Sequence, residues 1–224
     1  MAFNVNNRSL KFAGHLYPDI ELMKNILSVS KDEQYEIIRQ YFTEGVPSAF
    51  SKNPVLYEKI RTFLGGKIGV NAKSISITGS ARIGYSLSPI GNKFGRQYDE
   101  KKSDLDFFAV DANLFNNVSA DFNLFVQWLN SPTNTNVNMV LLRENERVIA
   151  KSILNGFIDQ DKIPDLINFP TVKSIYSSLR ELLRIMGDTK NCPQPKKTSI
   201  RIYKDWNSCI KRITLNITDA LEKS

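Results

Sequence analysis

The sequence is poor in the residues that bind soft metals or form disulfides. Its 224 residues include a single histidine, His15, and two cysteines, Cys192 and Cys209. These three residues cannot supply the four ligands of a usual zinc site. The cysteines leave two alternatives open, a Cys192–Cys209 disulfide or two unpaired thiols that are buried or idle, and such sparse cysteine usage favours the thiols.

Long apolar runs are also missing. No stretch approaches the roughly 20 apolar residues that span a bilayer, and the N-terminal residues MAFNVNNRSL lack the basic start and apolar core of a secretory signal. Apolar residues make up 42% of the chain and charged residues 24%, which is ordinary for a globular protein. We therefore expect a cytoplasmic protein without membrane contact, large enough for one good core with a helical extension.

Acidic residues are scarce towards the end of the chain. Residues 173–224 hold 11 of the 30 lysines and arginines but 5 of the 23 acids, and so carry most of the net charge of +7. This segment either contacts nucleic acid or an acidic protein partner, or is a solvated helical surface. Its stretch RIYKDW mixes bases and aromatics suited to nucleic acid. The spacing of Ile202, Trp206 and Ile210, however, favours an amphipathic helix with this side inward.

The chain does contain a regular succession of helix and strand patterns. Ser30 and Glu33 form a capping box at the start of the first clear helix, and Asn53-Pro54 opens the second. The periodicities predict one α+β domain with N-terminal helices in 1–66, a core in 67–170 and basic helices in 171–224. We expect helices near 30–44, 54–64, 120–130, 144–155, 171–187 and 200–221, and strands near 74–78, 104–110 and 136–142.

Two carboxylates stand one residue apart in the strand pattern DLDFFAV. Side chains alternate along a strand, so Asp104 and Asp106 project the same way, about 7 Å apart along the backbone. Leu105 and Phe107 then point into the core. Neighbouring like charges repel, and a divalent cation such as Mg²⁺ would remove that penalty. The alternative is a solvated strand end that carries two acids by chance.

The preceding strand ends in a turn with the chemistry of a phosphate site. Gly79 lets the backbone approach a phosphate without an intervening Cβ, and Ser80 offers a hydroxyl and an N–H group. Arg82 adds a positive charge, and Gly84 keeps the turn open. A helix that starts here would also direct its free N–H groups at an anion.

Together, the elements TGSARIGYS and SDLDFFAV resemble the signature of the nucleotidyltransferase superfamily, which has the DNA polymerase beta-like fold. That signature is Gly-Ser or Gly-Gly, a variable stretch, and then Asp-hydrophobic-Asp. The resemblance covers roughly residues 70–145 and implies a small mixed sheet flanked by helices. It also implies a nucleoside triphosphate whose phosphates lie on the Gly79-Ser80 turn, with Arg82 or Lys102 on the departing phosphates.

In this resemblance Asp104 and Asp106 hold Mg²⁺ or Mn²⁺ and catalyse in-line attack on the α-phosphate, with pyrophosphate as the leaving group. The acceptor would be RNA, a protein hydroxyl or a second nucleotide. Many small bacterial members act in toxin–antitoxin or phage-defence systems, which sets the family-level expectation. The alternative function is a catalytically weakened relative that binds nucleotide, nucleic acid or a partner protein.

Two features depart from the family pattern. Residues 81–103 form a long, partly basic linker between the two motif halves, which either folds over the triphosphate or is a surface loop. Active members also add a third carboxylate from a later strand. In the expected strand, NVNMVLL, Asn138 takes that place, and a neutral amide cannot accept a proton. Glu144 or Glu146 would substitute if the strand ran further.

Overall fold

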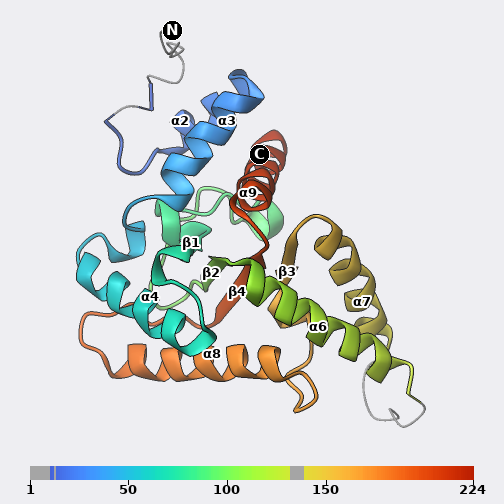
Figure 1. Ribbon diagram of the computed structural model, residues 1–224. Helices are drawn as coiled ribbons and strands as arrows, with labels where there is room; N and C mark the ends of the chain where they lie inside the picture. The colour runs from blue at the N-terminus through green and yellow to red at the C-terminus, as the bar shows by residue number, and fades with distance from the viewer. Residues whose placement is uncertain (1–10, 13, 132–138) are drawn as a thin grey trace, which may run out of the picture.

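The computed structural model describes residues 11, 12, 14–131 and 139–224, which form one four-stranded sheet surrounded by helices (Figure 1). The strands are β1 (Ile75–Thr78), β2 (Leu105–Val110), β3 (Phe157–Asp159) and β4 (Thr198–Tyr203). The α-helices of this part of the chain are α2 (Ile20–Lys24), α3 (Lys31–Ile38), α4 (Pro54–Ile68), α5 (Ser80–Ile83), α6 (Ala112–Leu129), α7 (Met139–Leu154), α8 (Pro170–Asp188) and α9 (Trp206–Glu222).

The sheet has the order β1-β2-β4-β3 and mixes both strand directions. β2 pairs with β1 in antiparallel fashion and with β4 in parallel fashion, and β3 lies antiparallel to β4. The register places Asp106 opposite Thr78 on β1 and opposite Ser199 on β4. The predicted α+β class and the small mixed sheet flanked by helices are therefore confirmed.

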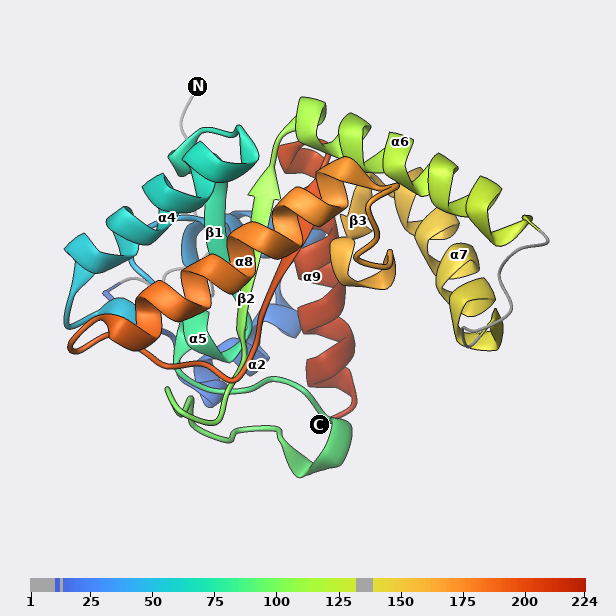
Figure 2. The same ribbon diagram turned by 90° about the horizontal axis from the view of Figure 1, so that it is seen from below.

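Each face of the sheet packs against its own layer of helices. One face packs against α4, α6 and α8, and the other against α3, α9 and the N-terminal turns (Figure 2). The alternation along β2 serves both layers, since Leu105 and Phe107 belong to the first apolar cluster and Phe108 and Val110 to the second. Burial of each such side chain stabilises the fold by about 1.5–3 kcal/mol, so β2 is fixed from both sides.

Side-chain caps decide where several helices begin. The capping box of Ser30 and Glu33 is present at the start of α3. Asp111 accepts a hydrogen bond from the Leu114 N–H at 2.8 Å, so α6 begins directly after β2 rather than near residue 120. Asp205 caps α9 in the same way. A carboxylate at this position satisfies N–H groups that have no partner in the helix.

Two predicted elements are wrong. The strand expected at 136–142 is not present at its described end, because residues 139–142 open α7, and Asn138 lies outside the described residues. The last helix does not begin at Ile200, because residues 198–203 form β4 at the centre of the sheet. The segment 171–224 is thus not helical throughout. Its sequence TSIRIY alternates apolar and polar residues with the period of a strand.

The structure favours the thiols among the two alternatives for the cysteines. Cys192 and Cys209 are free and buried, so they do not form a disulfide with each other. Of the helices in the described ranges, none combines the length and apolar character needed to cross a membrane.

Candidate functional site

A cavity of about 630 Å³ lies where β1 ends and β2 begins. Its other walls are the loop that follows α5 and the C-terminal half of α9. Figure 2 shows that this loop runs close to the C-terminal end of α9. The volume is in the range of small-molecule sites. The predicted site residues that line it are Gly79, Ser80, Lys102, Asp104 and Asp106.

The turn at Gly79 lies directly beside the carboxylate pair. Gly79 adopts φ 69° and ψ −154°, a conformation that residues with a Cβ avoid. A Cβ at Gly79 would lie 3.8 Å from Oδ2 of Asp106. The predicted meeting of the glycine turn and the acid pair is therefore present, and it arises because β1 and β2 are adjacent antiparallel strands.

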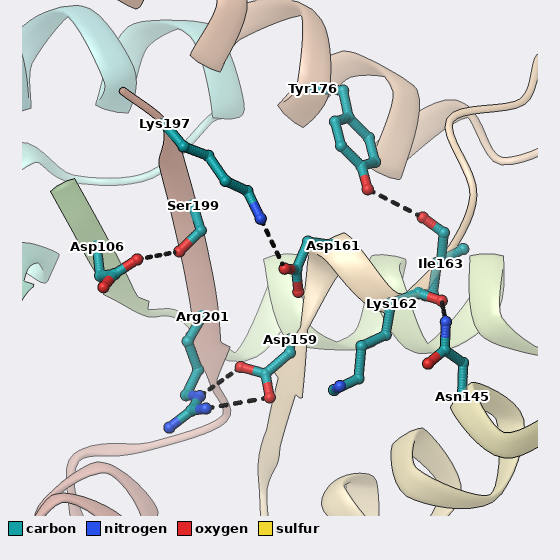
Figure 3. A network of polar contacts seen from close by, with 10 residues as sticks. All are labelled: Asp106, Asn145, Asp159, Asp161, Lys162, Ile163, Tyr176, Lys197, Ser199 and Arg201. Atoms are coloured by element: carbon teal, nitrogen blue, oxygen red, sulfur yellow. Dashed lines mark hydrogen bonds and ion pairs between the residues drawn. The ribbon is translucent and has the colours of Figure 1, made fainter. Parts of the chain in front are cut away.

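The two oxygens of Asp106 have different surroundings. Oδ1 accepts a hydrogen bond of 2.6 Å from the Ser199 hydroxyl on β4 (Figure 3), whereas Oδ2 is the oxygen nearest the Gly79 turn. Burial raises the pKa of the Asp106 carboxyl above its ordinary value, and the Ser199 hydrogen bond offsets part of that rise. The neighbouring charge of Asp104 adds to the rise. A cation near Asp106 would therefore favour the ionised form of that carboxyl.

Arg82 does not serve the cavity as predicted. Its side chain is 3% exposed, and its Nε and Nη1 donate to the carbonyls of Tyr41, at 2.6 Å, and Gly45, at 3.1 Å. Nη2 donates to the Glu44 carbonyl. The short helix α5 directs Arg82 away from the carboxylates and into the segment after α3. Because all three nitrogens are engaged there, its role is structural.

The loop between the motif halves forms a wall of the cavity. Its backbone is held by hydrogen bonds of 2.8 Å, from Ser86 to Arg96, from Gly95 to Ser86 and from Tyr98 to Gly84. The cations of this loop that line the cavity are Lys93, Arg96 and Lys102. Lys102 is largely exposed and lies 3.5 Å from Asp99. The loop therefore lines the cavity, and its closing over a triphosphate stays a prediction.

A third carboxylate is not found at the predicted positions that can be examined. Glu144 lies on α7 and lines a separate hollow with Arg143 and Arg147. The strand beside β2 is β4, where Ser199 occupies the position opposite Asp106. In the described ranges, no group of three or more histidine, cysteine, aspartate or glutamate side chains could hold a metal. The position opposite Asp106 on β4 is therefore occupied by a hydroxyl instead of a carboxylate.

Arg201 is a site residue that the sequence analysis missed. It lines the cavity from β4, and its Nε and Nη2 donate to the two carboxylate oxygens of Asp159 at 2.5 and 3.1 Å (Figure 3). The two residues are opposite each other in the register of β4 and β3. The alternation of TSIRIY places Ser199 and Arg201 on one face of a strand. This pattern could have identified Arg201, but the segment was predicted to be helical from Ile200 onward.

Some of the cations of the C-terminal segment form ion pairs. Those with a carboxylate partner include Arg180, Arg184, Lys197 and Arg201. Trp206, at 43% exposure, packs edge-on against Phe108. Lys223 lines the cavity, and contact of this segment with nucleic acid stays a prediction.

Comparison with known proteins adds no relative: no family model, curated protein or solved structure matches this chain. The functional argument therefore depends on the geometry of the site.

Proposed function

We propose that this chain is a metal-dependent, nucleotidyltransferase-like protein that binds a nucleoside triphosphate in the cavity between β1, β2 and α9. The observation that carries the proposal is the approach of the Gly79 turn to Oδ2 of Asp106, where a Cβ would lie 3.8 Å away. A phosphate bound at that turn would lie close enough to the acid pair to ligate a cation held by Asp104 and Asp106. A cytoplasmic location, where nucleoside triphosphates and Mg²⁺ are present, is part of the proposal.

The donor set suits Mg²⁺ or Mn²⁺. Hard cations take oxygen ligands, and Mg²⁺ commonly uses one or two carboxylates together with phosphate oxygens and water. Asp104 and Asp106 would hold the cation, which when bound would neutralise the pair and polarise the phosphates. The raised pKa of Asp106 fits this donor set, because a nearby cation favours the ionised carboxylate.

The residues of this chain would then position the reactants. The Gly79-Ser80 turn would hold the phosphates, and Lys102 with Lys93 and Arg96 would neutralise the departing charge. An acceptor oxygen forms a bond to the α-phosphorus as the bond to the bridging oxygen breaks. Pyrophosphate leaves with that oxygen, and the acceptor proton passes to water.

A second function, nucleotide binding without transfer, is favoured by one observation. Ser199, rather than an acid, stands opposite Asp106 on the later strand β4, and its hydroxyl donates to Oδ1. A neutral hydroxyl binds the catalytic metal less well than a carboxylate. This second function shares the cavity and the metal with the first, and differs in the absence of turnover.

One experiment tests both functions. Purified protein is incubated with Mg²⁺ or Mn²⁺ and α-labelled nucleoside triphosphates, and label transfer and nucleotide binding are both measured. We expect Asp104→Asn and Asp106→Asn to lower metal-dependent binding or transfer by about 100-fold or more. Asp188→Asn serves as the matched control, because Asp188 is exposed on α8 and pairs with Arg184.

The outcomes separate the functions. Metal-dependent label transfer that the two variants abolish supports the enzyme. Binding that depends on both aspartates, without transfer, supports the second function. Wild-type protein that binds no nucleotide in the presence of either metal overturns both.

A further inference from the structure

The C-terminal half of α9 lines the part of the cavity that the phosphates and the metal would not occupy. Residues at helical spacing, among them Ile213, Asn216, Ile217 and Ala220, turn one side of the helix into the cavity. Side chains three and four positions apart share a helix face. This wall combines apolar residues with the polar Asn216 and the charged Asp219 and Lys223, and it lies beside the turn formed by residues 90–92 (Figures 1 and 2).

The loop opposite α9 presents an apolar surface of its own. Leu87, Pro89 and Ile90 line the same cavity, and Ile90 is 77% exposed although it is a large apolar residue. Apolar surface in a cavity suits a flat ring, because stacking a ring against it removes both from water. A nucleoside base has this shape. If the phosphates of a nucleotide lie at Gly79, its base would occupy this part of the cavity.

Asp219 gives this part of the cavity an unusual charge. It lines the cavity from α9, and among the described residues its carboxylate has neither a hydrogen-bond nor an ion-pair partner. Lys223, four residues further along the chain, also lines the cavity. Because an unpaired carboxylate repels a triphosphate, we place Asp219 at the end of the ligand that lies away from the phosphates. Glu222, three residues further along α9, is exposed and does not line the cavity.

A carboxylate selects among bases by its hydrogen-bonding capacity. When ionised it only accepts, and its two oxygens match two adjacent N–H donors. Guanine presents such a pair in N1–H and the N2 amino group. Adenine and cytosine place an acceptor beside their amino group, and uracil places its N–H between two carbonyls. Asn216, with a donor and an acceptor, is compatible with a purine edge but does not discriminate as sharply.

We propose that Asp219 reads the base and that the preferred ligand is a guanine nucleotide, stacked between α9 and the loop at residues 87–90. This inference rests on the proposed nucleotide-binding function and names the class of nucleotide. The phosphates then extend from the base towards Lys93, Arg96 and Lys102 and reach the Gly79 turn.

The test compares the affinities of four triphosphates in the presence of Mg²⁺: those of guanosine, adenosine, inosine and xanthosine. We expect wild-type protein to bind the guanosine nucleotide about tenfold or more tightly than that of adenosine. Inosine lacks the N2 amino group and should bind about tenfold more weakly than guanosine. This comparison needs no variant.

A substitution then inverts the preference. In Asp219→Asn the side-chain amide donates to the O2 carbonyl of xanthine while its oxygen still accepts from N1–H. We expect the affinity for the guanosine nucleotide to fall about tenfold and that for the xanthosine nucleotide to rise by a similar factor. Glu222→Gln removes the same charge outside the cavity and should leave all four affinities unchanged.

The results test the assignment of the base separately from the proposed nucleotide binding. Equal wild-type affinity for the guanosine, inosine and adenosine nucleotides, or no change of preference in Asp219→Asn, overturns the assignment of the base while nucleotide binding stands. Wild-type protein that binds none of the four overturns the proposed function, and the assignment of the base with it.

Discussion

At the scale of single residues, Asp106 concentrates the chemistry of the site. One oxygen accepts from Ser199, the other lies by the Gly79 turn, and burial raises the pKa of the group. Ionised Asp106 therefore lowers the stability of the folded protein, which is expected of a carboxylate that binds a cation. A side chain selected for stability would not be placed there.

The pH dependence of stability follows from that shift. A carboxyl whose folded pKa is raised binds protons more tightly in the folded state, so stability falls as pH rises from the unfolded value of 3.8 through the folded pKa. We expect Asp106→Asn, which cannot ionise, to raise the free energy of unfolding at pH 7 and to raise it less at pH 4. Urea unfolding at both pH values measures this.

Metal provides the control for that prediction. Mg²⁺ or Mn²⁺ should stabilise the wild-type protein at pH 7 and should not stabilise Asp106→Asn, because ligand binding to the folded state alone shifts the unfolding equilibrium. A variant less stable than wild type at pH 7 without metal would contradict the burial argument.

At the scale of elements, β4 decides what the site contains. It pairs with β2 and β3, and so brings Ser199 to Asp106 and Arg201 to Asp159. The adjoining α9 supplies a wall of the cavity. The same residues in a helix starting at Ile200 would have formed a surface rather than the centre of the sheet.

A substitution in β4 tests that placement. Ile202 is fully buried in the cluster beneath α4, α6 and α8, so Ile202→Ala should lower the free energy of unfolding by about 3 kcal/mol. Leu215→Ala is the matched control on α9, where Leu215 is 48% exposed, and should change it by less than about 0.5 kcal/mol. Similar effects of both substitutions in urea unfolding would show that β4 is not central.

At the scale of the whole molecule, the sheet joins two apolar layers into one unit. β2 contributes side chains to both clusters, and Arg82 ties the turn at the site to the segment after α3. Residues 171–224 supply the strand between β2 and β3, so they do not form a separate helical unit. The site is consequently built from all three of the segments expected from the sequence.

Arg82 offers a test of this coupling. Arg82→Met would leave the carbonyls of Tyr41, Glu44 and Gly45 without their donor, and we expect a loss of about 3 kcal/mol in a single cooperative unfolding transition. Arg180→Met, at an exposed pair with Asp165, should cost less than about 1 kcal/mol. Unchanged stability of Arg82→Met would contradict the structural role of Arg82.

The sequence by itself determined the features that depend on local order. The alternation around Asp104 and Asp106, the glycine turn at residues 79–80 and the Ser30 capping box need no distant partner, because backbone geometry and neighbouring side chains fix them. The class of fold followed from the same periodicities. These features were enough to predict where the acid pair and the turn would meet.

Tertiary structure decided the rest, because it depends on which distant segments pair. TSIRIY fits a strand and, with the residues after it, a helix. Hydrogen bonding to β2 selects the strand and so sets Ser199, rather than an acid, beside Asp106. The direction of Arg82 likewise follows from carbonyls some forty residues away. Spacing along the chain carries no record of such partners, whereas packing and hydrogen bonding of buried groups fix them.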